Sequence, residues 1–342
     1  MGVAQMSGNT TRGDSNPSLE WYAPVIRDGY IERGVMEEFA GFSRFEKDRL
    51  DLLPIIEITE DSDLNNLVQY AQAGTPVLVD VPRYLTETEE PNGLTEDVEE
   101  LLTSTNSAVD FLNDNFDKVD VPVVSGPLDL PSDYTDLVDV YNSLSDDFDR
   151  VAVRIFIPST ELDESQVDDL RILEEVLAPQ DIVLLDYFEV GNLGPSATGR
   201  QNLIKVSELF ENYSRVILDA FNVFEGINYN FGPVIAKQAG VEGFGDFAVN
   251  QRYPPAKDIP MGLHDTRTIR HYDFDDREIV EFEGKGFSGP DRAYQELDSW
   301  NKWDSDHCEF CEEAATEDSE GFGFWKRVRV GHYIDSVIRE EV

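Results

Sequence analysis

Five apolar segments of this chain each carry one charged residue close to their carboxyl end. The charged residues are Glu57, Asp80, Arg154, Asp186 and Asp219. Because side chains alternate between the two faces of a strand, Glu57 shares a face with Ile55 and not with Ile56. We expect the other four residues to be placed in the same way. A charge inside an apolar strand is costly to bury without a partner, so the five positions call for one shared explanation.

The segments between these strands have the period of amphipathic helices. With Trp21–Arg27, a weaker strand at Val121–Gly126 and a last one at Gly245–Asn250, eight strands alternate with helices. This alternation predicts an α/β fold, a (β/α)8 TIM-barrel-like domain over residues 21–254. A doubly wound open sheet is the alternative, although it usually has fewer strands. Residues 1–20 are predicted to be a disordered lead, and residues 255–342 a C-terminal extension of short strands and helix packed on the barrel.

The charged residues fall towards the carboxyl ends of the strands, where barrels of this kind carry their active sites. The sequence therefore predicts catalytic residues at Glu57, Asp186 and Asp219. It predicts ligand-binding residues at Arg27, Asp80, Arg154 and Arg252, and places Asp246 near the opposite end of the eighth strand.

Three interpretations of this ring of charges stay open. In the first, the carboxylates hold Mg²⁺ or Mn²⁺ and the arginines hold a phosphate, as in a phosphoester-cleaving or phosphoryl-transfer enzyme. In the second, two carboxylates perform acid–base chemistry of the glycosidase kind without a metal. In the third, arginines and carboxylates close the top of the barrel as an ion-pair network, which an apolar layer would often replace without loss of stability.

The C-terminal region adds two further motifs. Cys308 and Cys311, with His307 beside them and His332 downstream, have residue types that bind zinc. Reduced cysteines in an exposed loop are the favoured alternative, because a second paired motif is missing. The stretch Phe322–Tyr333 interleaves aromatic and basic residues, so Arg327 and His332 are candidate ligand-binding residues that could contact nucleic acid. The favoured alternative is an apolar strand whose arginines pair with the acidic surface.

The charge of the chain indicates its solvent more than its partner. It has 70 Asp and Glu residues against 27 Lys and Arg, a formal net charge of −43 spread along the sequence. Such a surface stays hydrated at multimolar salt, where repulsion is screened within a few ångströms. We therefore expect a high-salt cytoplasm, and nucleic acid is not favoured as a partner. No apolar stretch approaches the roughly 18 residues of a membrane span, so no membrane is expected.

The opening Trp21–Arg27 strand and the Pro54-Ile55-Ile56-Glu57 strand resemble the start of the "beta protein" family of tailed phages and prokaryotic genomes. The Gly245-Asp246-Phe247 strand, the Cys-x-x-Cys motif and the late Trp325, Arg327 and His332 are similar to its closing part, as in a haloarchaeal-type member. The resemblance implies one barrel-like domain with a C-terminal extension and a role in phage–host biology, with no established activity.

Two functions follow as expectations. The first is a barrel enzyme that acts on a phosphorylated or nucleotide-like ligand at the carboxyl ends of the strands, in phage–host conflict. The alternative is a non-catalytic binding protein that uses the barrel mouth or the basic C-terminal segment.

Overall fold

The computed structural model describes most of the strands expected from the sequence. The described residues are 19–27, 34–36, 38–39, 50–58, 76–83, 101, 104–115, 119–126, 134–187, 190–191, 194–219, 229–248, 267–284, 289–316 and 322–340. Residues 1–18 of the predicted lead, the predicted helix over 64–73 and Arg252 lie outside this part of the chain.

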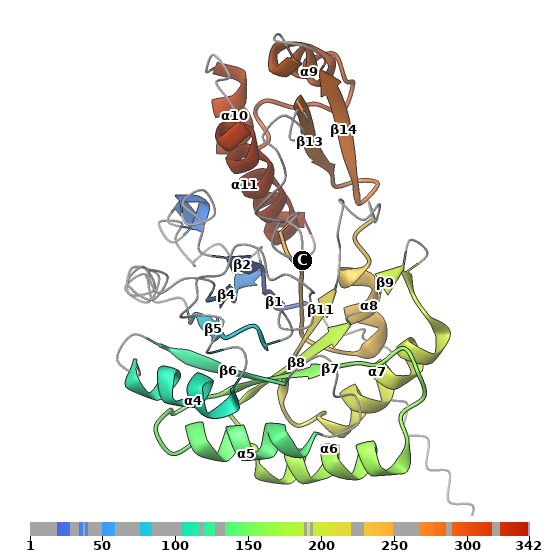
Figure 1. Ribbon diagram of the computed structural model, residues 1–342. Helices are drawn as coiled ribbons and strands as arrows, with labels where there is room; N and C mark the ends of the chain where they lie inside the picture. Colours follow the sequence, from blue (N-terminus) through green and yellow to red (C-terminus); the bar gives the residue numbers. More distant parts are fainter. Residues whose placement is uncertain are drawn as a thin grey trace, which may run out of the picture.

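One parallel sheet forms the centre of the described structure (Figure 1). Its strands are β1 (Trp21–Tyr22), β2 (Val25–Arg27), β3 (Asp51–Leu52), β4 (Ile55–Glu57), β5 (Leu78–Asp80), β6 (Val121–Ser125), β7 (Ala152–Phe156), β8 (Ile182–Tyr187), β11 (Ser214–Asp219) and β12 (Gly243–Gly245). Only two residues separate β1 from β2 and β3 from β4, so each pair is one interrupted strand. The ten segments of the described sheet therefore correspond to the eight expected strands.

The sheet closes on itself. β1 pairs in parallel with both β12 and β3, and β2 pairs with β4. Beyond the named strands, the amides of Ala23 and Val25 donate to the carbonyls of Phe244 and Asp246 at 2.8 and 2.7 Å. The predicted TIM-barrel-like fold is thus confirmed. The eighth strand is earlier than expected, since β12 ends at Gly245, and Asp246 follows its carboxyl end instead of lying near the opposite end.

Glycine is required where the last strand meets the first. A Cβ atom on Gly245 would lie 2.0 Å from the carbonyl oxygen of Ala23 and 2.9 Å from a methyl carbon of Leu218. Both are closer than real Cβ contacts allow, so a larger residue would push β12 away from β1. The glycine therefore permits the barrel to close.

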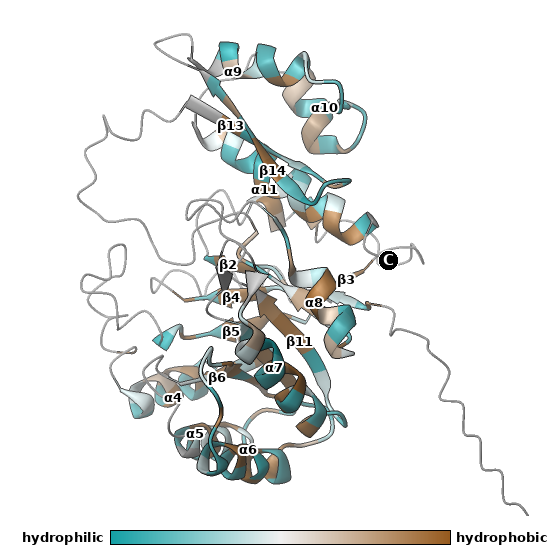
Figure 2. Ribbon diagram, turned by 90° about the vertical axis from the view of Figure 1, so that its right-hand side faces the viewer, coloured by the Kyte–Doolittle hydropathy of each residue, from teal (hydrophilic) through white to brown (hydrophobic). Residues whose placement is uncertain are grey.

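Helices cover the outside of the barrel between successive strands (Figure 1). They are α4 (Thr105–Asp114), α5 (Thr135–Leu144), α6 (Glu164–Val176), α7 (Ala197–Leu209) and α8 (Gly232–Ala239). The helix start predicted at Asp163 is correct, because its side chain and that of Gln166 form a capping box. Gly240 ends α8 in the left-handed conformation at φ 68°. In Figure 2, β11 is coloured largely hydrophobic, whereas α5 and α6 carry both hydrophilic and hydrophobic residues.

The C-terminal residues form a group of elements beside one end of the barrel (Figure 1). A two-stranded antiparallel hairpin of β13 (Arg267–Asp273) and β14 (Glu278–Gly284) packs with α9 (Gly289–Asp298), α10 (Glu309–Thr316) and α11 (Phe322–Glu340). A smaller antiparallel pair, β9 (Val190–Gly191) and β10 (Gly194–Pro195), follows β8.

The basic segment predicted as a strand is the helix α11, so that prediction was wrong. The helix contacts the barrel, because the ring of Tyr333 lies edge-on to the ring of Tyr22 with centroids 6.3 Å apart. The carbonyl of Ile338 also accepts a hydrogen bond from the amide of Leu50 at 2.9 Å. Burial of these apolar residues against the first strands outweighs the strand-like alternation of the segment. Within the described residues, no helix combines the length and the apolar character needed to cross a bilayer.

Candidate functional site

Charged side chains from five of the parallel strands lie in one layer inside the barrel. The strand register pairs Arg27 with Glu57, and Glu57 with Asp80. It also pairs Ser125 with Arg154 and Phe156 with Asp186. Residues paired in parallel strands point to the same face, so these side chains meet at the carboxyl ends of β2, β4, β5, β7 and β8. The structure thus brings together Arg27, Glu57, Asp80, Arg154 and Asp186, as the sequence led us to expect.

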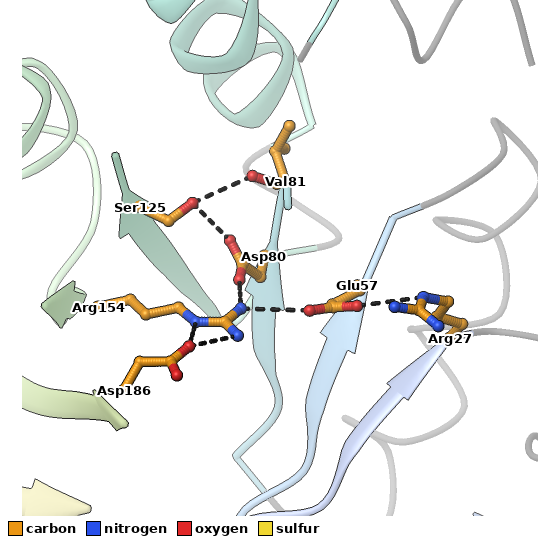
Figure 3. A network of polar contacts seen from close by, with 7 residues as sticks. All are labelled: Arg27, Glu57, Asp80, Val81, Ser125, Arg154 and Asp186. Atoms are coloured by element: carbon orange, nitrogen blue, oxygen red, sulfur yellow. Dashed lines mark hydrogen bonds and ion pairs between the residues drawn. The ribbon is translucent and has the colours of Figure 1, made fainter. Parts of the chain in front are cut away.

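Arg154 is the centre of this network (Figure 3). Its Nε donates to Asp186 Oδ2 at 2.8 Å, and Nη2 lies 2.7 Å from the same oxygen. Its Nη1 donates to Asp80 Oδ2 at 2.5 Å and to Glu57 Oε1 at 3.2 Å. All four side chains are fully buried. A planar guanidinium with several donors can hold three carboxylates at once, which the point charge of a lysine would do less well.

Arg27 extends the network towards solvent. Its Nε lies 3.3 Å from Glu57 Oε2, and its side chain is 19% exposed. The guanidinium also lies over the ring of Phe247 at 5.9 Å from the centroid. Arg27 is therefore held in place on one side and accessible on the other, which suits a residue that contacts a ligand.

The protonation of Asp80 depends strongly on its surroundings. Ser125 Oγ donates to Asp80 Oδ1 at 3.0 Å, and to the carbonyl of Val81 at 3.1 Å in an alternative hydroxyl orientation. Burial raises the pKa of Asp80 to about 6, although the charge of Arg154 acts in the opposite direction. A carboxyl group with this pKa can exchange a proton near neutral pH.

The position of Arg154 bears on the predicted Mg²⁺ or Mn²⁺. The three carboxylates converge on its guanidinium, which occupies the place where a divalent cation would need to sit. The two arginines carry two positive charges and the three carboxylates carry three negative charges, which leaves a formal net charge of only −1. The residues present therefore do not fit a metal at this point of the ring.

Two predicted members of the ring are not placed with the others. The register pairs Asp219 with Tyr187 and pairs Leu218 with Asp186, so Asp219 does not share the register of Asp186. The side chain of Asp219 lies outside the described residues, as does the whole of Arg252. The expectation that all five charges occupy equivalent strand positions is therefore wrong for Asp219.

The Cys-x-x-Cys motif lies in a buried cluster and not in an exposed loop, so that prediction was wrong. Cys308 and Cys311 are 7% and 0% exposed, because α10 packs against α11. Their sulfurs lie 3.6 and 3.3 Å from Nδ1 of His332, which stacks on His271 with ring centroids 3.9 Å apart. Burial lowers the pKa of His271 well below its ordinary value, so this imidazole is neutral.

Arg327 pairs with acidic residues, as the sequence led us to expect. Its guanidinium bridges Glu38 and Glu313 from two other parts of the chain. Arg329 on the same helix is buried at 7% exposure. Arg327 is held by these two glutamates, and His332 belongs to the cysteine cluster. Neither is therefore part of the charged layer around Arg154.

Sequence reasoning missed Ser125, His271 and the hydrogen-bond partners of Asp246. Ser125 could have been found, because it ends its strand as the charged residues end theirs. His271 gave no signal, because a long stretch of sequence separates it from its partner His332. The carboxylate of Asp246 is buried and accepts hydrogen bonds from the hydroxyls of Tyr22, at 2.9 Å, and Tyr333.

Comparisons with known proteins leave the family of the chain unassigned. No protein-family model matches it, and no curated protein sequence does. Among solved structures, the chain is similar to CdNal from Clostridium difficile in complex with mannosamine, with 10% sequence identity and a TM-score of 0.38. The match covers 67% of this chain and 70% of that one. A likeness this distant says nothing about the ligand of this chain.

Proposed function

We propose that this chain is a barrel enzyme that binds an anionic, phosphorylated or nucleotide-like ligand at the carboxyl ends of its strands. The observation that carries the proposal is the charged layer centred on Arg154, in which four side chains from four strands are fully buried. Stability alone gives little reason for such a layer, because an apolar one would often serve as well. Polar layers at this end of a barrel commonly serve binding and catalysis.

Within the proposal, Arg27 and Asp80 have different roles. Arg27 is accessible and cationic, so it contacts the anionic group of the ligand. Asp80 has a pKa near 6 and exchanges a proton with the ligand. Glu57 and Asp186 position Arg154, which holds Asp80 in place. This assignment favours acid–base chemistry over metal chemistry in the ring, because Arg154 fills the space between the carboxylates.

The setting of the proposed enzyme is a high-salt cytoplasm, supported by the net charge of −43 and by two cysteines with no disulfide partner. Membership of the beta protein family and a role in phage–host conflict are part of the same proposal. They rest on the short motifs around Trp21, Glu57 and Trp325.

A ligand-binding experiment tests the role of Arg27. Ligand-induced shifts in melting temperature would be measured in molar KCl against sugar phosphates and nucleoside phosphates. We expect at least one of these to stabilise the native protein, and Arg27→Gln to abolish most of that shift. Arg171→Gln is the matched control, because Arg171 is also an ion-paired arginine but lies exposed on α6 at 2.6 Å from Asp168. Equal shifts in both variants would contradict binding at the barrel mouth.

Turnover of the stabilising ligand separates an enzyme from a binding protein. Asp80→Asn should remove turnover while binding persists. The control is Asp181→Asn, a buried carboxylate at the amino end of β8 that accepts from Tyr141 at 2.8 Å and from two backbone amides. Binding without turnover in the native protein would favour the non-catalytic alternative. The basic segment is a weaker surface for that alternative, because Arg327 is paired and Arg329 is buried.

A further inference from the structure

We propose that Cys308, Cys311, His332 and His271 bind one Zn²⁺ ion as a structural centre of the C-terminal region. The centre is separate from the charged layer of the barrel and does not depend on the function proposed for it. Among the described residues, His271, Cys311 and His332 form a buried group whose ligand atoms all lie within 4.8 Å of one another. Cys308 joins this group through Cys311 and His332.

Three of the ligand atoms already have the spacing of a zinc site. The sulfurs of Cys308 and Cys311 are 3.4 Å apart, and they lie 3.6 and 3.3 Å from Nδ1 of His332. Zn–S and Zn–N bonds of about 2.3 and 2.0 Å at tetrahedral angles place neighbouring ligand atoms roughly 3.5–3.8 Å apart. The triangle of two sulfurs and one nitrogen therefore approximates one face of a zinc tetrahedron with little movement of the protein.

The hydrogen bonding of His332 selects the nitrogen that would face the metal. Nε2 lies 3.0 Å from the carbonyl oxygen of Tyr272, which can only accept. The proton of a neutral imidazole is therefore placed on Nε2, and the lone pair of Nδ1 points at the two sulfurs. A backbone carbonyl that fixes the ring in this way is a common outer partner of a metal-binding histidine.

His271 is the fourth ligand. Its ring now stacks on that of His332 with an interplanar angle of 15°, so metal binding requires the ring to turn out of the stack towards the sulfurs. It lies on β13, and the edges of Trp300 and Trp303 cover it at centroid distances of 5.8 and 5.1 Å. With these rings packed against it, His271 is only 7% exposed, which favours a centre with protein ligands only.

The local sequence brings the cysteines to His332. Cys308 directly precedes α10 and Cys311 lies in its first turn, so both thiols lie at the helix end where negative charge is favoured. Gly331, the neighbour of His332, allows α10 and α11 to approach, since a Cβ there would lie 2.3 Å from the ring of Phe310. Two thiolates and Zn²⁺ have no net charge, which suits a buried position better than a carboxylate site would.

A zinc ion here would add a direct link between three elements that already pack on one another. Its ligands come from β13, from α10 with the residue before it, and from α11. A two-stranded hairpin such as β13–β14 is marginally stable alone, so a metal link to α11 would hold it against the rest of the protein. A cleft of about 120 Å³ lined by His271, His307 and His332 provides an entry path for the ion.

Metal analysis of the full chain, purified without chelator, tests the proposal. We expect one equivalent of zinc per chain. We also expect Co²⁺ exchanged into the site to give the thiolate charge-transfer band and intense visible bands of a tetrahedral centre. Removing the metal with a chelator should lower the melting temperature by roughly 5–10 °C, and added Zn²⁺ should restore it.

Variants identify the fourth ligand. His271→Ala should lose zinc or bind it far more weakly, whereas His307→Ala should keep it, because Nε2 of His307 contacts Ser336 at 3.1 Å and His307 is not in the group of ligand atoms within 4.8 Å of one another. Equal zinc retention in both variants would overturn the assignment of His271. A native chain that binds neither Zn²⁺ nor Co²⁺, or that isolates with Cys308 and Cys311 as a disulfide, would overturn the centre itself. The metal content of the native chain and the oxidation state of its two cysteines decide the question even if a variant fails to fold.

Discussion

Replacing Arg154 by methionine tests whether the charged layer is held by one cation. The substitution keeps much of the side-chain volume but leaves Glu57, Asp80 and Asp186 buried around an apolar group. Removing one partner from a buried ion pair typically costs about 3–5 kcal/mol, because the remaining charges lose their compensation. The free energy of unfolding of a native protein is only about 5–15 kcal/mol, so we expect Arg154→Met to lose a large part of its stability at neutral pH.

The loss should depend on pH with a defined sign. Burial already raises the folded-state pKa of Asp80 to about 6, and Arg154 opposes that rise. Without the cation the pKa rises further above its unfolded value. The stability that protonated Asp80 contributes is full below the unfolded pKa and is lost as pH rises through the folded pKa. The difference between the variant and the native protein should therefore shrink as pH falls from about 8 to about 5.

Urea denaturation in molar KCl, followed by tryptophan fluorescence, measures both quantities. Arg171→Met is the control, because its ion pair with Asp168 is exposed and such pairs contribute about 1 kcal/mol or less. Adding Glu57→Gln, Asp80→Asn and Asp186→Asn to Arg154→Met should recover much of the loss, since neutral groups need no cation. A variant as stable as the native protein, or a loss that does not change with pH, would refute the reasoning.

Three further predictions concern the fold as a whole. The net charge of −43 predicts a higher melting temperature in molar KCl than in dilute buffer, and the absence of any gain would remove the high-salt interpretation. Gly245→Ala should cost several kcal/mol or prevent barrel closure, because its Cβ would lie 2.0 Å from the oxygen of Ala23; a calorimetric melt equal to that of the native protein would contradict this. Burial raises the pKa of Asp246 to about 6, so its contribution to stability is lost as pH rises through that value. Asp246→Asn should flatten the pH dependence of unfolding between about pH 4 and 7 by roughly 3 kcal/mol, and an unchanged profile would assign that dependence to other groups.

The strands and the charged layer could be predicted because both depend on patterns within single segments. Apolar runs mark the strands, and a charge two residues beyond an inward apolar residue shares its face, as Glu57 does with Ile55. The register between strands has no such local pattern. For that reason Asp219 was placed with Asp186, although hydrogen bonding aligns it with Tyr187 one residue further on.

The C-terminal predictions failed where tertiary packing overrides local pattern. Arg327-Val328-Arg329-Val330 alternates with the period of a strand, yet it lies within α11 because the helix buries Val328 and Val330. Because no second paired motif accompanies Cys308 and Cys311, the sequence favours an exposed loop, whereas α10 turns both cysteines inward. His271 could not be assigned from spacing, since it reaches the cysteines only after the chain has folded back through β14 and α9.

The pairing of β1 with β12 has a consequence for the order in which the chain can fold. The hydrogen bond from Tyr22 to Asp246 joins residues 224 positions apart, and the same carboxylate accepts from Tyr333 another 87 positions on. During synthesis, seven strands leave the ribosome before the one that joins the first to the last. Until then the nascent sheet has two unpaired edges, which attract other chains. Contacts between residues so far apart in the sequence form slowly. The pairing of β1 with β12 should therefore set the folding rate and define the period in which a chaperone is needed.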